Sequence, residues 1–90
     1  MPKRTRYADE FVRRFAELPQ GQQSSVEASL EVLLAAADPT ALAHHLERRA
    51  YYCSWSHRVS GNLLVVFAAA RTTLTFLSVG THAQAYRPKA

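Results

Sequence analysis

Two apolar runs near the C-terminal end of the chain constrain its fold more than any other feature. Asn62–Phe67 and Leu74–Val79 are rich in leucine, valine and phenylalanine, and only a short segment around Arg71 separates them. Segments of this length and composition are typical of strands, and a short connection pairs consecutive strands antiparallel. Leu63–Phe67 is apolar at every position, so we expect this strand to be central and covered on both faces.

A third extended segment precedes these two runs. Tyr51, Tyr52, Trp55 and Val59 suit a strand, and Ser60-Gly61-Asn62 is typical of a hairpin turn. The three segments are therefore expected to form an antiparallel meander that ends at Val79. The residues just before the first helix are a candidate edge strand for the same sheet.

The N-terminal half of the chain shows the 3.6-residue period of two amphipathic helices. The apolar positions of the first are Ala8, Phe11, Val12, Phe15 and Leu18. Those of the second are Val26, Leu30, Leu33, Leu34 and Ala37. Leu18-Pro19-Gln20-Gly21 separates the helices, and the second begins either near Pro19 or at Ser24. Asp38-Pro39 ends it, because the residue before a proline avoids the helical region.

The order of these elements predicts an α+β domain. Two N-terminal helices pack on one face of a small antiparallel sheet, as apolar helix and sheet faces require. A further helical turn is expected within Ala41–Leu46, before a loop. Ninety residues suffice for one domain, which we expect to span residues 1–90.

The composition favours an anionic partner and an intracellular location. The formal net charge is +4 and the pI is about 9.7, and a basic surface attracts nucleic acid, acidic proteins or lipid headgroups. Cys53 is the single cysteine, which excludes a disulfide within the chain and makes the cytosol the default. No signal-peptide core and no run of membrane-spanning length is present in the sequence, so a soluble cytoplasmic protein is expected.

Metal and nucleotide chemistry have weak support. Cys53 and His57 share a strand face, but a zinc site needs two further ligands and none is obvious nearby. His44 and His45 are adjacent, so their side chains diverge. The three glycines do not form a phosphate-binding loop. We therefore expect no metal and no other cofactor.

The strongest candidate site follows the last strand. Gly80-Thr81 leads into His82, and Tyr86 comes four residues later. Arginines near these strands are Arg48, Arg49, Arg58 and Arg71. Together they would suit metal-free RNA cleavage, in which one group takes the 2′-hydroxyl proton, arginines hold the phosphate oxygens and another group protonates the 5′-oxygen. The alternative is that Tyr86 caps the sheet while His82 and the arginines form a solvated basic face.

The order of motifs along almost the whole chain resembles the RelE/ParE superfamily of bacterial type II toxin–antitoxin toxins. The motifs that carry the resemblance are Phe11-x3-Phe15-x2-Leu18, Asp38-Pro39, His45-Leu46, Trp55-Ser56-His57-Arg58-Val59-x-Gly61, Val65-Val66-Phe67 and Val79-Gly80-Thr81-His82-x3-Tyr86. The ending is most similar to the YafQ-like mRNA interferases, and the Trp55 strand is similar to the YoeB-like ones. The resemblance implies a small α+β fold, metal-free cleavage of mRNA on the ribosome to a 2′,3′-cyclic phosphate, inhibition of translation, and a cognate acidic antitoxin.

The resemblance also implies roles for individual residues. His82 matches a histidine that acts as general acid or base, and Tyr86 matches an aromatic residue that positions the nucleotide. Arg58 matches a strand position whose side chain is aimed at the phosphate. His57 is the neighbouring candidate, but strand alternation lets only one of the two face the site, and we favour Arg58. The remaining RNA contacts are expected from Arg48, Arg49 and Arg71.

One residue departs from the pattern. RelE- and YoeB-like toxins carry an arginine where this chain has Leu64, and that arginine stabilises the transition state. YafQ-like toxins also have an apolar residue there but carry an acidic residue and a tryptophan where this chain has Asn62 and Leu63. Three functions therefore stay open: an mRNA endoribonuclease, a ParE-like inhibitor of DNA gyrase, and a catalytically degenerate homologue that binds only antitoxin or RNA.

Overall fold

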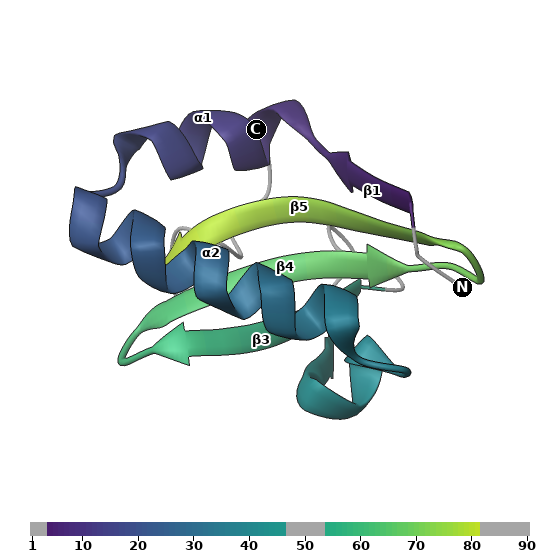
Figure 1. Ribbon diagram of the computed structural model, residues 1–90. Coiled ribbons are helices and arrows are strands. Elements are labelled where there is room, and N and C mark those ends of the chain that lie inside the picture. The colour runs from purple at the N-terminus through teal and green to yellow at the C-terminus, as the bar shows by residue number, and fades with distance from the viewer. Residues whose placement is uncertain (1–3, 47–53, 82–90) are drawn as a thin grey trace.

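The computed structural model describes residues 4–46 and 54–81, which form an α+β fold with two helices against one sheet (Figure 1). The elements in chain order are β1 (Arg4–Tyr7), α1 (Asp9–Glu17), α2 (Gln20–Ala35), the 3₁₀ helix η1 (Pro39–Leu42), β2 (His44–Leu46), β3 (Ser54–Ser60), β4 (Leu63–Ala69) and β5 (Thr73–Thr81). The predicted fold class and the predicted order of helices and strands are confirmed.

The sheet has five strands in the order β1-β5-β4-β3-β2. The predicted meander of β3, β4 and β5 is antiparallel, and the predicted N-terminal edge strand is present as β1. β1 pairs with β5 in parallel, however, so the expectation of an entirely antiparallel sheet is wrong. No hairpin joins β1 to β5, so no short turn forces these two strands to run in opposite directions.

The segment after α2 differs in part from the prediction of one helical turn. Pro39–Leu42 is a short 3₁₀ helix whose first turn is capped by Asp38 Oδ1, which accepts from Thr40 N at 3.1 Å. The residues that follow, His44–Leu46, form the edge strand β2 instead and pair with β3. The edge of β3 carries backbone N–H and C=O groups that need hydrogen-bond partners, and β2 supplies them. A longer helical turn would have left these groups without partners.

At the corner between the two helices, α2 begins at Gln20, directly after Pro19. Of the two predicted starts, the one near Pro19 is therefore correct and Ser24 is not. Proline at this place suits a helix start because its missing N–H needs no partner. The Gln23 side-chain amide donates to Phe15 O at 2.9 Å, which satisfies a carbonyl in the last turn of α1. The corner is thus stabilised by a side chain of α2 on the end of α1.

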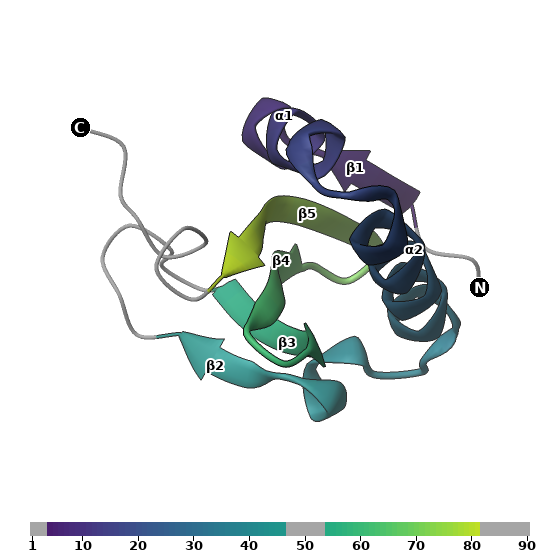
Figure 2. The same cartoon turned by 90° about the vertical axis from the view of Figure 1, so that its left-hand side faces the viewer.

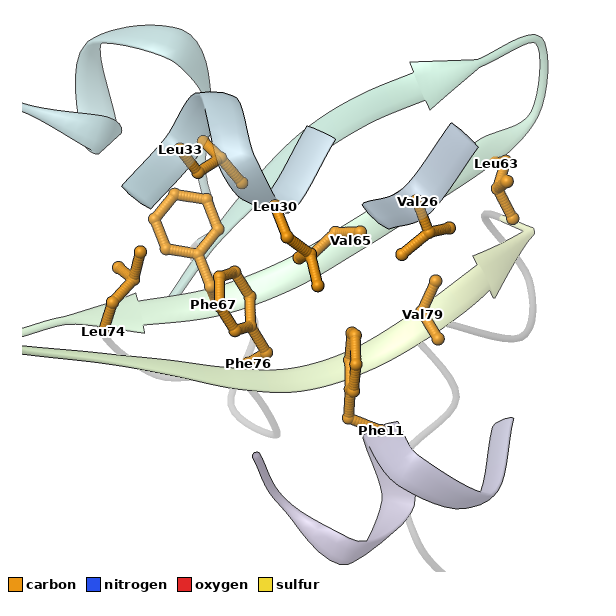
Figure 3. Close-up of a cluster of buried hydrophobic side chains, with 10 residues drawn as sticks. All are labelled: Phe11, Val26, Leu30, Leu33, Leu63, Val65, Phe67, Leu74, Phe76 and Val79. Carbon is orange, nitrogen blue, oxygen red and sulfur yellow. The ribbon is translucent and has the colours of Figure 1, made fainter. Parts of the chain in front are cut away.

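The core lies between the helices and one face of the sheet (Figure 3). Its buried side chains are Phe11, Val26, Leu30, Leu33, Leu63, Val65, Phe67, Leu74, Phe76 and Val79. Phe76 is its centre of aromatic contact, with ring centroids 5.7 Å from Phe11, 6.3 Å from Phe67 and 5.5 Å from Tyr7. Offset and tilted ring pairs of this kind add stabilisation beyond the area they bury.

The central strand β4 is buried on both of its faces. Leu63, Val65 and Phe67 point into the core, while Leu64 and Val66 alternate to the other face and are also buried. The prediction of a central covered strand is therefore confirmed.

A bulge in β5 changes which residues face the core. Phe67 pairs with Phe76 and Val66 with Ser78, so Leu77 is an additional residue without a partner on β4. Before the bulge the core residue is Phe76, and after it the core residue is Val79. The bulge thus shifts the residues of β5 that face the core from even-numbered positions to an odd-numbered one.

A side-chain hydrogen bond joins α1 to β5 just after this bulge. Glu10 Oε2 accepts from Ser78 Oγ at 3.1 Å and from Arg14 Nε at 3.1 Å. Ser78 is fully buried, so its hydroxyl needs this partner. The contact joins residues 68 positions apart in the chain.

We expect Phe76→Ala to lower the free energy of unfolding by about 3–5 kcal/mol, because it leaves a cavity at the centre of the core. Urea denaturation followed by circular dichroism measures the change. The control is Val32→Ala, which removes a valine that is 54% exposed and should alter stability by less than about 0.5 kcal/mol. Equal losses in the two variants would contradict this description of the core.

Ser78→Ala is expected to cost about 1–3 kcal/mol, because it deprives a partly buried carboxylate of a hydrogen-bond donor. The matched control is Ser25→Ala, whose exposed hydroxyl donates only to Gly21 O within its own helix. The same denaturation experiment compares them. A Ser78→Ala protein as stable as the control would mean that the Glu10 contact contributes nothing to stability.

Candidate functional site

Three residues on adjacent strands form a row at one end of the sheet. Arg58 on β3 pairs with Leu64 on β4, and Leu64 pairs with Gly80 on β5. With strands about 4.8 Å apart, the outer two backbones are separated by about 10 Å. β5 ends one residue beyond Gly80, at Thr81, and His82 follows directly in the chain. The row therefore places Arg58 near the end of β5, to which the predicted histidine is next in sequence.

Arg58 and His57 lie on different faces of β3. Trp55 packs against the core, and strand alternation places His57 on the same face. Arg58 belongs to the opposite face and is exposed, with no ion pair to any residue within 4–46 or 54–81. Its guanidinium is thus available to an anionic ligand as far as the described residues are concerned.

His57 instead makes a contact with the backbone. Its Nδ1 lies 2.8 Å from Leu42 O at the end of η1. This contact joins β3 to the segment that leads into β2, and it leaves Nε2 as the ring nitrogen for any further partner. The arrangement gives His57 a structural contact that the sequence did not predict.

Leu64 occupies the middle of the row, where the resemblance would place an arginine. Its side chain is 7% exposed. Beside it, Gly80 has a φ of +152°, a backbone conformation that side-chain-bearing residues rarely adopt. An apolar side chain and a glycine therefore stand between Arg58 and the end of β5, and neither supplies a charge.

Arg71 lies at the other end of the sheet. It is exposed in the connection between β4 and β5, beyond Ala69. Because each strand residue advances about 3.3 Å, the stretch of β4 from Leu64 to Ala69 alone places it roughly 17 Å or more from the Arg58 row. The structure does not bring these two arginines together.

Several predicted site residues lie outside the described residues. These are Arg48, Arg49, His82 and Tyr86, and their roles stay predictions. Cys53 also lies outside them, and of His44 and His45 only the backbone pairing with β3 is described.

The described part of the chain has neither a metal-binding cluster nor a membrane-spanning helix. Residues 4–46 and 54–81 contain no cluster of three or more histidine, cysteine, aspartate or glutamate side chains that could hold a metal ion. No helix in these ranges has the length and apolar character needed to cross a membrane.

Sequence reasoning did not foresee two features that shape this end of the sheet. One is the Glu10–Ser78 contact, for which the sequence offers no local signal because its partners are so far apart. The other is the conformation of Gly80. A glycine inside a strand pattern does signal a bulge or an unusual backbone, so this position could have been singled out.

The fold is shared with solved structures of bacterial and archaeal toxins. No protein-family model and no curated protein matches the chain. Among solved structures, YafQ from Escherichia coli BL21(DE3) superposes with a TM-score of 0.77 at 15% identity, covering 94% of this chain and 99% of that one. The DinJ–YafQ toxin–antitoxin complex of E. coli gives 0.74 at 14% identity, over 97% and 100%.

A third neighbour is the toxin–antitoxin complex RelBE2 from Mycobacterium tuberculosis. Its TM-score is 0.71 at 21% identity, covering 92% of this chain and 94% of that one. The similarity extends over nearly the full length of each protein, although the sequences have diverged widely. The predicted RelE-like α+β fold is therefore confirmed.

We expect neutral His57 to carry its proton on Nδ1, because a carbonyl oxygen only accepts and Leu42 O faces that nitrogen. Two-dimensional ¹⁵N–¹H correlation spectra of the imidazole ring distinguish the tautomers. Pro39→Ala, which should loosen η1, is expected to reduce the preference. A ring protonated on Nε2 alone in the unaltered protein would show that the contact is not formed.

Proposed function

We propose that this protein is the toxin of a type II toxin–antitoxin system and cleaves mRNA on the ribosome without a metal ion. The observation that supports this most is the exposed guanidinium of Arg58, placed in the row from which the chain continues to His82. The row occurs in a fold shared with YafQ and RelBE2. Because translating ribosomes are found in the cytoplasm, this is the proposed location of the protein.

The proposed reaction is an attack of the ribose 2′-oxygen on the adjacent phosphorus. A base removes the 2′-hydroxyl proton, the new bond closes a 2′,3′-cyclic phosphate, and the bond to the 5′-oxygen breaks as that oxygen receives a proton. His82 serves as one of the two proton-transfer groups, since histidine titrates near neutral pH. Arg58 holds the non-bridging oxygens, on which negative charge grows in the transition state.

The remaining residues have supporting roles in this proposal. Tyr86 stacks on a nucleotide, and Arg48, Arg49 and Arg71 neutralise phosphates along the RNA. Arg71 would contact RNA well away from the cleaved bond, because it lies at the far end of the sheet. His57 takes no step, since it lies on the core side of β3 and contacts Leu42.

Leu64 limits the rate that this site can reach. A cation at this position would stabilise the transition state, and removing one such donor typically costs about 3–4 kcal/mol. We therefore propose a slow enzyme in which, among the described residues, Arg58 is the single arginine at the cleaved phosphate.

The proposed partner is an acidic antitoxin. Two of the similar structures are complexes of a toxin with its antitoxin, and this chain carries a net charge of +4. Exposed arginines on β1 and α1, at Arg4, Arg6 and Arg13, would attract an acidic chain and raise its association rate. The expected assembly is a toxin–antitoxin hetero-oligomer.

Induction of the chain without its partner should arrest growth, and either Arg58→Ala or His82→Ala should relieve the arrest. We expect Arg58→Ala to slow mRNA cleavage about 10²–10³-fold and His82→Ala to slow it by about 10²–10⁴-fold. Primer extension on mRNA from translating ribosomes measures the cleavage. Arg13→Ala, an exposed arginine on α1, is the control and should cleave as the unaltered protein does.

The same experiment separates the other functions. Growth arrest without mRNA cleavage, together with loss of DNA supercoiling by gyrase, would replace the nuclease by a gyrase inhibitor. Normal growth at full induction of folded protein would contradict both toxin functions and indicate a homologue that only binds.

A further inference from the structure

A concave surface lies on the helix side of the sheet, at the same end as the Arg58 row. The α1–α2 corner, the β3–β4 hairpin and the end of β5 gather there (Figures 1 and 2). They enclose a concavity of about 340 Å³, at the small end of the range of about 300–1,000 Å³ found for small-molecule sites. Its lining residues are Leu18, Gln22, Ser60, Gly61, Asn62, Leu63 and Thr81.

The lining chemistry restricts the kind of ligand. The polar side chains are two amides and two hydroxyls, and no charged residue is among them. Leu18 and Leu63 supply apolar surface beside these groups. A phosphate would find no cation among the described residues here, and a purely apolar ligand would leave the amides of Gln22 and Asn62 without hydrogen-bond partners. A flat neutral group can pack its face on the leucines and hydrogen-bond through its edge to the amides and hydroxyls.

We propose that this concavity binds an unpaired base of the RNA close to the cleaved phosphate, around the hairpin from Arg58. Asparagine and glutamine amides offer a donor and an acceptor side by side, which matches the edges of bases. Proteins that recognise single-stranded RNA read such splayed bases by hydrogen bonds to their edges. The inference rests on the proposed nuclease function and adds a base-reading site to it.

This site lies one row beyond Arg58 and on the other face of the sheet, because Leu63 points toward the helices and Arg58 points away from them. Ser60 pairs with Leu63, and Leu63 pairs with Thr81, which forms the next row toward the end of the sheet. Successive strand residues are about 3.3 Å apart. An RNA strand with one phosphate held by Arg58 can therefore reach the concavity by passing around the tip of the β3–β4 hairpin.

The hairpin turn that borders the concavity depends on Gly61. Gly61 has a φ of +47°, and a Cβ built on it would meet nothing within 4 Å. The residue therefore serves the backbone turn and its missing side chain leaves free space above it. A larger residue at this position would be strained and would project into open space.

The first test maps cleavage sites on ribosome-bound mRNA for Gln22→Ala and Asn62→Ala. We expect the unaltered protein to prefer certain bases beside the cut, and each variant to reduce this preference about threefold to tenfold, as the loss of one hydrogen bond predicts. Overall cleavage should persist, because neither side chain meets the reacting phosphate. Gln20→Ala, an exposed glutamine of the same helix outside the lining, is the control.

Cleavage by the unaltered protein with the same distribution of sites in all variants would overturn the base site but keep the nuclease. No cleavage by the unaltered protein would overturn the proposed function, and a second test then decides on the base site alone. Hexaadenylate, hexacytidylate and hexauridylate are added to ¹⁵N-labelled protein, and the side-chain amide signals of Gln22 and Asn62 are followed. Shifts that differ between the three RNAs support the site, and unmoved or identical signals overturn it.

Discussion

The pairing of β4 on both of its edges, combined with burial of both of its faces, is the constraint on which the rest of this structure depends. Leu63–Phe67 has no polar side chain, so the strand is stable only when backbone partners lie on each side and apolar groups cover it above and below. β3 and β5 supply the backbone partners, and the two helices cover the face of β4 that carries Leu63, Val65 and Phe67. Arg58 and Gly80 owe their positions to their pairing with this strand.

The sequence predicted those parts of the fold that depend on local pattern. The apolar periods located both helices, and the alternation and turn residues located β3, β4 and β5. It did not predict that β1 runs parallel to β5 or that His44–Leu46 is a strand, because both depend on a partner distant in the chain. The bulge at Leu77 is of the same kind, since it exists only in the register between β4 and β5.

The candidate site shows the same division. Alternation correctly put Arg58 and His57 on different faces, because that choice depends only on the strand period. The contact of His57 with Leu42, and the distance of Arg71 from the Arg58 row, follow from how η1 and the turns are placed in three dimensions. Whether Arg58 acts on a phosphate stays a prediction. The four site residues beyond the described ranges were chosen from the sequence and the resemblance alone.

β5 is the last element of the described residues, and it pairs with the first, which has a consequence for how this domain is made. β1 pairs with β5, α1 packs on it, and Glu10 bonds to Ser78, so the first quarter of the chain finds its partners in the last. During synthesis β1 and α1 cannot form these contacts until residues 73–81 have left the ribosomal exit tunnel. Closure of such long-range contacts comes late in folding. A chain that lacks residues 73–81 is therefore unfinished as a domain, because β1 and α1 have no partner strand.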